Sequence, residues 1–355
     1  MENELKRVLK KIGVFEKAEE LSLDSSLDVL SKSSSDLQRQ LRVNDAQAQD
    51  ILKAASKDAY DWRMREKTGH ELIQHDFHSL TTGDVMIDKV LNGGVSPGEI
   101  TEIVGESSSG KTQLALQLCI TAQKPISEGG LDGSAVYIHS EGPFPSARLD
   151  QLVSSYPSDR QQTLKNNIYT IRINDSEEQY RLLSYQLPAF LLQQKKAKKQ
   201  VRVVVIDSIS AIYRSELTPV NRRFNKMSEI CEIGSRLKKM ASQFDVAIVA
   251  VNQVSDVLTK NNNPSTDQLE HWMDFRLINS NENNHMIGLY IQSLLKRPVL
   301  GLSWSNSVNT RIRLARSPML DGMITRRVLF VEFSPKAQRL GCEVMIDDSG
   351  IHAKD

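Results

Sequence analysis

Apolar and polar positions follow two different patterns along this chain, and the change falls near residue 80. From Leu80 onward, short apolar runs of strand length alternate with stretches in which apolar residues recur at helical spacing. The strand-like runs are 99–104, 134–140, 167–173, 201–208 and 246–253, and the helical stretches between them are 113–123, 146–156, 177–194 and 227–244. This alternation predicts a mostly parallel sheet with helices on both faces.

The C-terminal part of the chain continues the strand pattern without long helical stretches. Three further strand candidates lie at 309–315, 326–333 and 342–347, and short segments connect them. Parallel strands need longer crossover connections than these. We therefore expect 246–253 to be the last parallel strand, followed by an antiparallel extension of the sheet.

The first 60 or so residues carry the periodicity of short amphipathic helices. The apolar face of the first helix is formed by Leu5, Val8, Leu9 and Ile12. The segment 21–36 is rich in serine and aspartate, which indicates a flexible hinge open to modification or a plain solvated linker. We expect a small helical module and linker over 1–79 and an α/β core over 80–355.

The composition limits the kinds of partner that the protein can bind and the compartment in which it is expected to work. Basic and acidic residues number 45 and 44, so any binding of nucleic acid has to rest on local patches. The three cysteines are far apart and form no CxxC pair, which argues against a disulfide framework and a zinc site and fits a reducing compartment. The N-terminus lacks an apolar signal region and the apolar runs are too short to span a membrane, so we expect a soluble intracellular protein without a membrane partner.

A phosphate-binding pattern follows the first strand of the core. The pattern G-x-x-x-x-G-K-[ST] is matched by Gly105, Glu106, Ser107, Ser108, Ser109, Gly110, Lys111 and Thr112. In such a loop the backbone amides wrap the β-phosphate, the lysine reaches the β- and γ-phosphate oxygens, and the hydroxyl binds Mg²⁺. The alternative is a serine-rich turn that only caps a helix, but the strand before the loop and the helix after it favour nucleotide binding.

Three strand ends bring polar side chains to one edge of the predicted sheet. Asp207 follows a buried run and is expected on the Mg²⁺ side, although a helix cap is the alternative. Glu141 is the candidate base that polarises water for attack on the γ-phosphate, or else a turn residue that faces solvent. Asn252 and Gln253 end the next run, where an amide can sense the γ-phosphate or merely cap a loop.

Four segments resemble, in order and spacing, the RecA-type recombinase core of eukaryotes and archaea. They are "GGVSPGEITEIVGESSSGKTQLALQLC", "GGLDGSAVYIHSEGPFPSARLDQL", "VRVVVIDSISAIYR" and "VAIVAVNQV". The resemblance covers residues 80 to about 255, and "RPVLGLSWSNSVNTRIRLAR" with "IDDSGI" extends it to the C-terminus. The phrases "GKTQLALQLC" and "FPSARL" resemble the recombinase paralogues, the group that assists the main recombinase. The implied fold is a RecA-like P-loop ATPase core.

The resemblance also implies roles for single residues. Five positions match the family's nucleotide-handling residues, in the roles that the patterns above already suggest: Lys111, Thr112, Glu141, Asp207 and Gln253. Arg148, which no pattern singles out, matches an arginine that lies against adenine. The implied cofactors are ATP and Mg²⁺.

The chain departs from active recombinases in the linker before the core. Active recombinases carry a Phe-x-x-Ala element there, which docks on the neighbouring subunit and builds the filament, and the linker 59–79 has none. The motif does occur at Phe15–Ala18 and Phe144–Ala147, and we interpret both as accidental. This departure argues against self-polymerisation. Tyr60 and Trp62 are candidate aromatic anchors for a partner subunit, or else they pack on their own domain.

Candidate DNA contacts are local and basic. The second DNA-facing loop, 255–298, is long and rich in asparagine, and its acidic and amide content suits a partner better than a phosphate backbone. The basic candidates for single-stranded DNA lie in the first loop region: Arg214, Arg222, Arg223 and Lys226. "KKAKK" at 195–199 is interpreted as a solvated face. Phe333 stands where active recombinases have an aspartate that reaches toward the neighbour's ATP.

Three functional hypotheses follow. The resemblance implies a nuclear mediator of DNA repair by homologous recombination, with slow, DNA-dependent ATP hydrolysis. Such a mediator pairs with another paralogue in a heterodimer or larger complex, and it assembles or stabilises filaments of the main recombinase on single-stranded or branched DNA. The alternative is an adaptor that holds ATP without productive hydrolysis, which Glu141 argues against. Autonomous strand exchange is disfavoured by the departures in the linker and loop.

Overall fold

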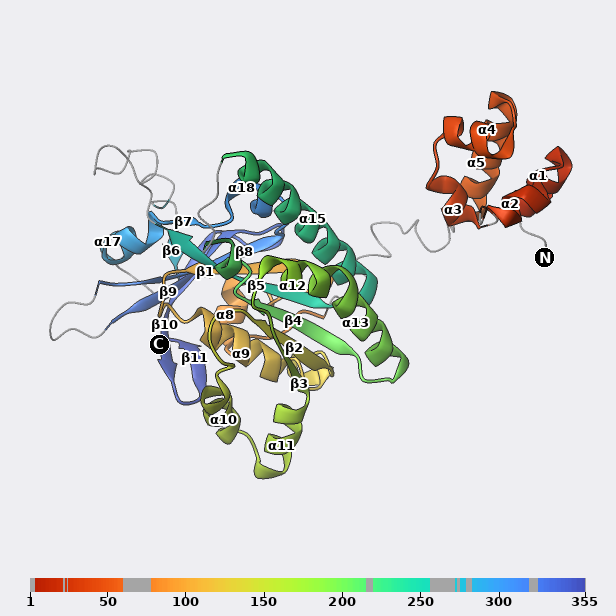
Figure 1. Ribbon diagram of the computed structural model, residues 1–355. Coiled ribbons are helices and arrows are strands. Elements are labelled where there is room, and N and C mark those ends of the chain that lie inside the picture. Colours follow the sequence, from red (N-terminus) through yellow and green to blue (C-terminus); the bar gives the residue numbers. More distant parts are fainter. Residues whose placement is uncertain are drawn as a thin grey trace. The chain divides into compact units, whose positions relative to one another are not determined.

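The computed structural model describes residues 4–21, 23, 25–59, 78–214, 220–255, 272, 275–278, 283–318 and 325–354. The chain divides into two compact units, Met1–Asp76 and Phe77–Asp355 (Figure 1). The division falls close to the predicted boundary between residues 79 and 80.

In the residues of the N-terminal unit that the structure describes, all regular structure is helical. Its helices are α1 Glu4–Ile12, α2 Phe15–Glu20, α3 Ser26–Leu30, α4 Ser34–Leu41 and α5 Asp45–Ala59. Leu5 and Leu9, one helical turn apart on α1, are fully buried in one cluster with Ile51 of α5. Asp58 of α5 accepts hydrogen bonds from the backbone amides of Glu4 (3.1 Å) and Leu5 (2.6 Å), so it caps α1 and fixes the two helices together.

The prediction of a loop or hinge over 21–36 is wrong in part, because this segment contains α3 and the start of α4. The serines act as helix caps here. The Ser33 hydroxyl accepts a hydrogen bond from the amide of Asp36 (3.2 Å), and the Asp36 carboxylate accepts one from the amide of Ser33 (3.4 Å). This capping box starts α4 at the point where composition alone indicated a linker.

The C-terminal unit is built on one large sheet with the main strand order β11-β10-β9-β8-β1-β5-β4-β2-β3, to which β6 adds beside β10 and β7 beside β5. The strands are β1 Ile100–Gly105, β2 Ser134–His139, β3 Ile168–Arg172, β4 Val201–Asp207, β5 Ala247–Ser255, β6 Arg276–Leu277, β7 Arg297–Pro298, β8 Thr310–Arg316, β9 Arg327–Phe333, β10 Leu340–Asp347 and β11 Gly350–Ala353. From β3 to β8 the neighbours in the main order are parallel. From β8 to β11 they are antiparallel, which confirms the predicted fold class.

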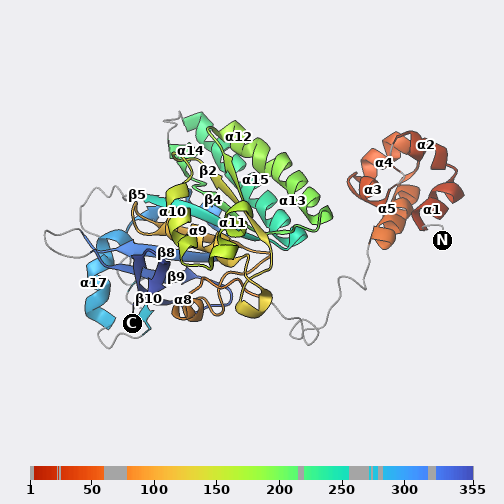
Figure 2. The same ribbon diagram turned by 90° about the horizontal axis from the view of Figure 1, so that it is seen from below.

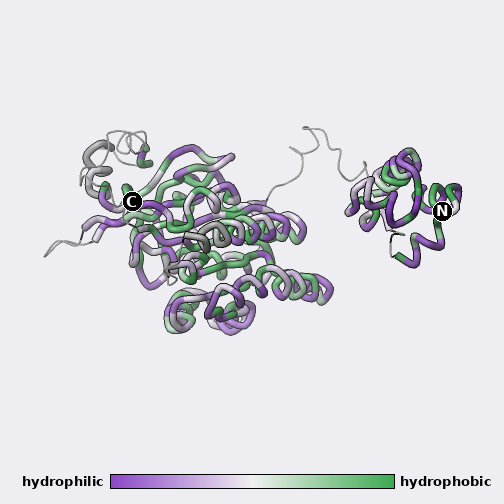
Figure 3. Tube along the Cα trace, turned by 45° about the horizontal axis from the view of Figure 1, so that its top comes forward, coloured by the Kyte–Doolittle hydropathy of each residue, from purple (hydrophilic) through white to green (hydrophobic). Residues whose placement is uncertain are grey.

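Helices cover both faces of this sheet (Figures 1 and 2). They are α8 Val85–Val90, α9 Lys111–Thr121, the 3₁₀ turn η1 Ile126–Glu128, α10 Ser146–Ser154, α11 Ser158–Asn166, α12 Ser176–Arg181, the π-helical segment η2 Leu182–Gln186, α13 Leu187–Lys196, α14 Ala211–Arg214, α15 Val220–Phe244, α17 Asn283–Leu294 and α18 Gly301–Ser305. Along β4, Val203 and Val205 enter the core beneath α8 to α11, whereas Val204 and Ile206 enter the core beneath α12 to α15. The sheet therefore has a hydrophobic core on each of its two faces, and Figure 3 marks the hydrophobic residues along the trace in green.

The end of the sheet differs from its prediction in one respect. We expected 246–253 to be the last parallel strand, but β8 also pairs in parallel with β1, with Thr310 opposite Thr101. The reason is the connection, because the chain between β5 and β8 is long enough to cross over and contains α17 and α18. Among the described residues, no helix combines the length and the apolar character needed to cross a membrane.

Candidate functional site

The phosphate-binding pattern forms the turn between β1 and α9. β1 ends at Gly105 and α9 begins at Lys111. A Cβ atom on Gly105 would lie 2.2 Å from the carbonyl oxygen of Leu314, so only glycine fits where the loop leaves the sheet. The first backbone amides of α9 have no acceptor within the helix, and they point into the loop together with the positive end of the helix dipole. This arrangement favours a bound anion.

A cavity of about 500 Å³ opens over this loop. Eight of the predicted site residues line it: Ser107, Ser108, Gly110, Lys111, Thr112, Glu141, Asp207 and Gln253. Three residues that sequence reasoning missed line it as well: Gln113, Arg327 and Ile346. The cavity therefore joins the loop to the carboxyl ends of β2, β4 and β5, where open α/β sheets bind their ligands.

Two residues of the loop, Glu106 and Ser109, do not line the cavity. The carboxylate of Glu106 lies 2.7 Å from Nζ of Lys296 and 3.3 Å from Nε of Arg316, so it anchors the loop to the end of β8 and to the residue before β7. Ser109 is fully buried. Lys111 in turn donates from Nζ to the backbone carbonyl of Glu106 at 2.6 Å.

Asp207 is the centre of an oxygen-rich corner of the cavity. Its Oδ2 accepts hydrogen bonds from the hydroxyls of Thr112 (2.7 Å) and Tyr137 (2.6 Å). Burial and the charge of Asp207 raise the pKa of Tyr137, so this phenol stays protonated and donates. Sequence reasoning missed Tyr137, although a hydroxyl on the buried strand β2 signals a polar partner.

These oxygens fit Mg²⁺ as a partner of a nucleotide. The described residues contain no group of three or more His, Cys, Asp and Glu side chains that could hold a metal by itself. Mg²⁺ in phosphate sites needs only one or two protein oxygens, because phosphates and waters supply the others. Thr112 and Asp207 provide such a pair, and Tyr137 fixes the orientation of the carboxylate.

Glu141 and Gln253 meet at the cavity although β4 lies between their strands. Nε2 of Gln253 is 2.9 Å and 2.7 Å from the two carboxylate oxygens of Glu141. The backbone amide of Gln253 donates to the hydroxyl of Ser210 (3.2 Å), and its carbonyl accepts from Val299 (2.9 Å). Gln253 thus connects the cavity to the segment that leads into α18.

Asn252 faces away from the cavity. Its Nδ2 donates to Oε1 of Glu102 at 2.7 Å, and both residues are fully buried. The same carboxylate accepts from Nε1 of Trp304 (2.9 Å) and from Nε of Arg311 (2.6 Å). The amide pair at the end of β5 is therefore divided between the cavity and a buried polar network.

Arg148 does not line the cavity but holds one of its walls. Its Nη2 donates to the carbonyl of Asp347 (2.6 Å) and its Nη1 to the carbonyl of Asp348 (3.4 Å), while its Nε donates to Gln113. Asp347 ends β10 and directly follows the pocket residue Ile346. Arg148 thus ties α10 to the turn between β10 and β11.

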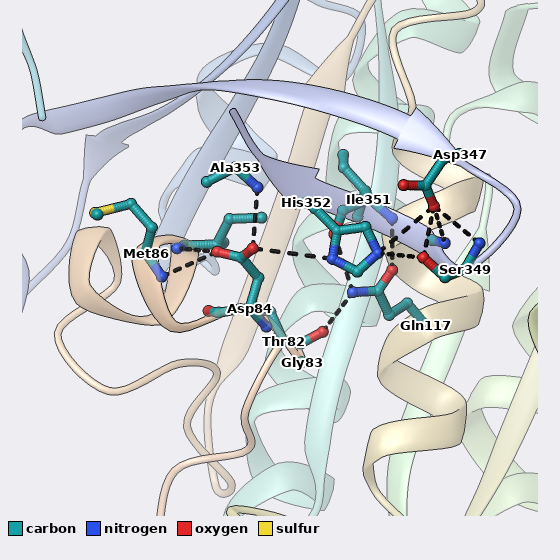
Figure 4. Close-up of polar contacts among 12 residues, drawn as sticks. Thr82, Gly83, Asp84, Met86, Gln117, Asp347, Ser349, Ile351, His352 and Ala353 are labelled. Atoms are coloured by element: carbon teal, nitrogen blue, oxygen red, sulfur yellow. Dashed lines mark hydrogen bonds and ion pairs between the residues drawn. The ribbon is translucent and has the colours of Figure 1, made fainter. Parts of the chain in front are cut away.

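β10 and β11 form an antiparallel hairpin, and Gln117 in the middle of α9 holds its other side (Figure 4). Its Nε2 donates to the carbonyls of Thr82 (2.7 Å) and Ile351 (3.1 Å), and its Oε1 accepts from the amide of Ile351 (2.7 Å). A glutamine within the apolar run from Leu114 to Ile120 is the sequence signal for such a contact.

The tip and the end of the hairpin are also held by polar contacts (Figure 4). The carboxylate of Asp84, which caps α8, accepts from the amide of Ala353 at 3.0 Å. The hydroxyl of Ser349 donates to Asp347 and lowers the pKa of that carboxyl, and it lies 2.9 Å from Nε2 of His352. The cavity wall that contains Ile346 is therefore fixed to both α8 and α9.

The remaining candidates divide into two groups. The first group lies outside the described residues: Tyr60, Trp62, half of the loop 255–298 (residues 256–271, 273–274 and 279–282) and the side chains of Arg214, Arg222, Arg223 and Lys226. Phe15 and Phe144 pack within their own units, Phe15 beside Lys10 and Phe144 against Tyr137. Phe333 lies beneath the guanidinium of Arg311 at 4.8 Å.

Known proteins resemble this chain over most of its length. The sequence model of the Rad51 family matches residues 74–269. The chain is 33% identical over 300 residues to the DNA repair protein XRCC3 homolog of Arabidopsis thaliana, an alignment that covers 77% of this chain and 92% of that protein. It is 33% identical over 297 residues to DNA repair protein rhp57 of Schizosaccharomyces pombe, covering 77% of this chain and 79% of that protein. It is 37% identical over 182 residues to DNA repair protein RAD57 of Saccharomyces cerevisiae, covering 50% of this chain and 38% of that protein.

Proposed function

This chain belongs to the Rad51 family, and from that membership we propose that it is an ATP- and Mg²⁺-binding recombinase paralogue that works in DNA repair by homologous recombination. The relatives with which it aligns over most of their length are named as DNA repair proteins.

The observation that carries the proposal is the convergence of five side chains on one cavity. Lys111 and Thr112 come from the loop, Asp207 from β4, Glu141 from the end of β2 and Gln253 from β5. Together they supply a cation for the phosphates, oxygens for Mg²⁺, and a carboxylate that can accept a proton from water. A site that only holds a nucleotide as a structural element has no need of that carboxylate.

The chemistry of this chain's residues follows from their positions. Bound Mg²⁺ would neutralise charge on the β- and γ-phosphates. Lys111 holds the terminal phosphates, and Glu141 orients the attacking water and takes up its proton. Gln253 is bonded to Glu141 and to the segment before α18, so release of the γ-phosphate changes the contacts of both. We infer slow hydrolysis that reports the nucleotide state to the DNA-facing side of the core.

We further propose that the protein acts as a mediator in the nucleus. In this role it pairs with another recombinase paralogue and assembles or stabilises filaments of the main recombinase on single-stranded or branched DNA. The linker without a Phe-x-x-Ala element supports a role beside the filament rather than self-polymerisation. A structural adaptor without productive hydrolysis is the second candidate.

ATP hydrolysis by the purified chain, alone and with its co-purifying partners, tests this proposal. Hydrolysis is measured with and without single-stranded DNA. Turnover that requires both a partner and DNA supports the mediator, whereas tight ATP binding with no turnover under any condition supports the adaptor. Efficient strand exchange by the chain alone would contradict both.

A further inference from the structure

Arg327 stands beside the phosphate loop, where sequence reasoning placed no functional residue. It is the first residue of β9, it lines the cavity, and apart from Lys111 it is the cavity's only cationic side chain among the described residues. Its Nε donates to the carbonyl of Ser108 at 3.3 Å, and its Nη1 donates to the carbonyl of Thr325 at 3.4 Å. The guanidinium therefore lies against the loop itself.

A second arginine opposes the charge of Arg327, and no carboxylate in the described part of the chain balances it. Arg316 on β8 lies directly across from Arg327 in the antiparallel register. Arg316 has a counter-ion in Glu106, which it shares with Lys296. For Arg327, the described residues place no carboxylate within 4 Å. Burial, and next the charge of Arg316, lower the pKa of Arg327.

Like charges directly opposite each other in a sheet are unfavourable. The half-buried guanidinium of Arg327 has no counter-ion among the residues that the structure describes, and it lies beside a loop whose amides favour an anion. A phosphate that enters the loop would supply this counter-ion. Its Nη2 has no acceptor among the described residues, so a donor is left for that phosphate.

We propose that Arg327 is a phosphate-binding residue of this site, whose guanidinium contacts a phosphate oxygen of the nucleotide held by the loop. The inference rests on the proposed nucleotide binding and adds to it a residue that the loop pattern does not contain. Because Arg327 and Ser108 belong to one chain, this positive charge is supplied without a second subunit. Arginine suits the position because its planar fork can hold the loop carbonyl with one nitrogen and a phosphate oxygen with another.

Equilibrium binding of MgATP, MgADP and AMP to the full chain tests the proposal, with Arg327→Gln, Arg327→Lys and the wild type measured side by side. We expect Arg327→Gln to weaken MgATP by tenfold or more, MgADP by less, and AMP hardly at all, because the lost contacts are with the outer phosphates. Arg327→Lys keeps the charge and recovers part of the loss. Arg326→Gln is the matched control, because Arg326 pairs with Glu343 and does not line the cavity.

Two results would overturn the assignment. The first is an Arg327→Gln variant that binds all three nucleotides as the wild type does. The second is an equal loss for all three, AMP included, which would show that the substitution deforms the loop. A wild-type chain that binds none of them would instead contradict the proposed function, so the two failures are distinguishable.

Discussion

The amide of Gln253 and the carboxylate of Glu141 contact each other at the cavity, with Nε2 2.9 Å and 2.7 Å from the two oxygens. The two residues lie 112 positions apart in the chain. They meet because β2, β4 and β5 are parallel neighbours whose carboxyl ends share one edge of the sheet. A water that Glu141 activates must therefore either displace the amide of Gln253 from the carboxylate or bind the carboxylate together with that amide.

Replacing Glu141 by Gln should separate binding from hydrolysis. The variant keeps the shape of the side chain but cannot accept a proton, so we expect MgATP binding within a few-fold of wild type. The single-turnover rate of hydrolysis should fall by about 10²-fold or more, the usual contribution of a general base. The exposed Glu128, changed to Gln, is the control. An unchanged rate in Glu141→Gln would show that another group activates the water.

Tyr137→Phe tests whether Asp207 has to be oriented. The substitution removes only the hydroxyl that donates to Oδ2 of Asp207 and keeps the edge-on contact of the ring with Phe144. We expect the apparent affinity for Mg²⁺ in the presence of nucleotide to fall about tenfold, as for other residues that orient a metal ligand. Nucleotide binding titrated against Mg²⁺ measures this. A titration midpoint identical to that of wild type would remove Tyr137 from the site.

The residues at the strand ends show which parts of the site can be predicted from the sequence. Glu141, Asp207 and Gln253 could be placed at one edge because parallel strands put their carboxyl ends together, whatever their order in the sheet. Tyr137 and Arg327 could not be found in the same way. Their partners are 70 and 219 residues away, so their roles depend on strand register that periodicity does not determine.

The buried network around Glu102 illustrates a second limit. A glutamate within an apolar strand signals a buried partner, but the sequence does not identify Arg311 or Trp304 as that partner. The same holds for the loop residue Glu106, which the pattern counts as part of the nucleotide site and the structure pairs with Lys296 and Arg316. A motif fixes the path of the backbone better than it fixes the direction of each side chain.

Glu102→Gln should destabilise the C-terminal unit strongly. The substitution removes the charge of the nearer of the two carboxylates that pair with the buried Arg311 and leaves it the longer contact with Glu332 (3.4 Å). Breaking a buried ion pair costs about 3–5 kcal/mol, and because Glu332 remains we expect a loss near the lower end of that range. Denaturant unfolding measures the change. Lys165→Ala is the control, because it breaks a partly exposed pair with Asp150 and should cost less than about 1 kcal/mol. A loss for Glu102→Gln no larger than the control's would contradict the importance of the network.

Gly350→Ala should loosen the hairpin that carries Ile346. Gly350 has a φ of 145°, and a Cβ atom there would lie 2.2 Å from Oε1 of Gln117. The side chain of Gln117 has to move, so we expect faster hydrogen exchange of the amides of β11. Gly288→Ala is the control, since nothing lies within 4 Å of its Cβ position. Equal exchange in both variants would show that Gln117 does not hold the hairpin.

Equilibrium binding of MgATP to the wild-type chain and to Lys111→Ala tests the central claim most directly. The loop and cavity predict that the wild type binds MgATP. Removing the lysine should weaken binding by about thirtyfold or more, because loss of one partner of a desolvated charge pair costs about 2–5 kcal/mol. Thermal unfolding without nucleotide should be unchanged within a few degrees, which confirms that the variant is folded. Equal affinity for MgATP in the two proteins would contradict the assignment of residues 105–112 as the nucleotide site.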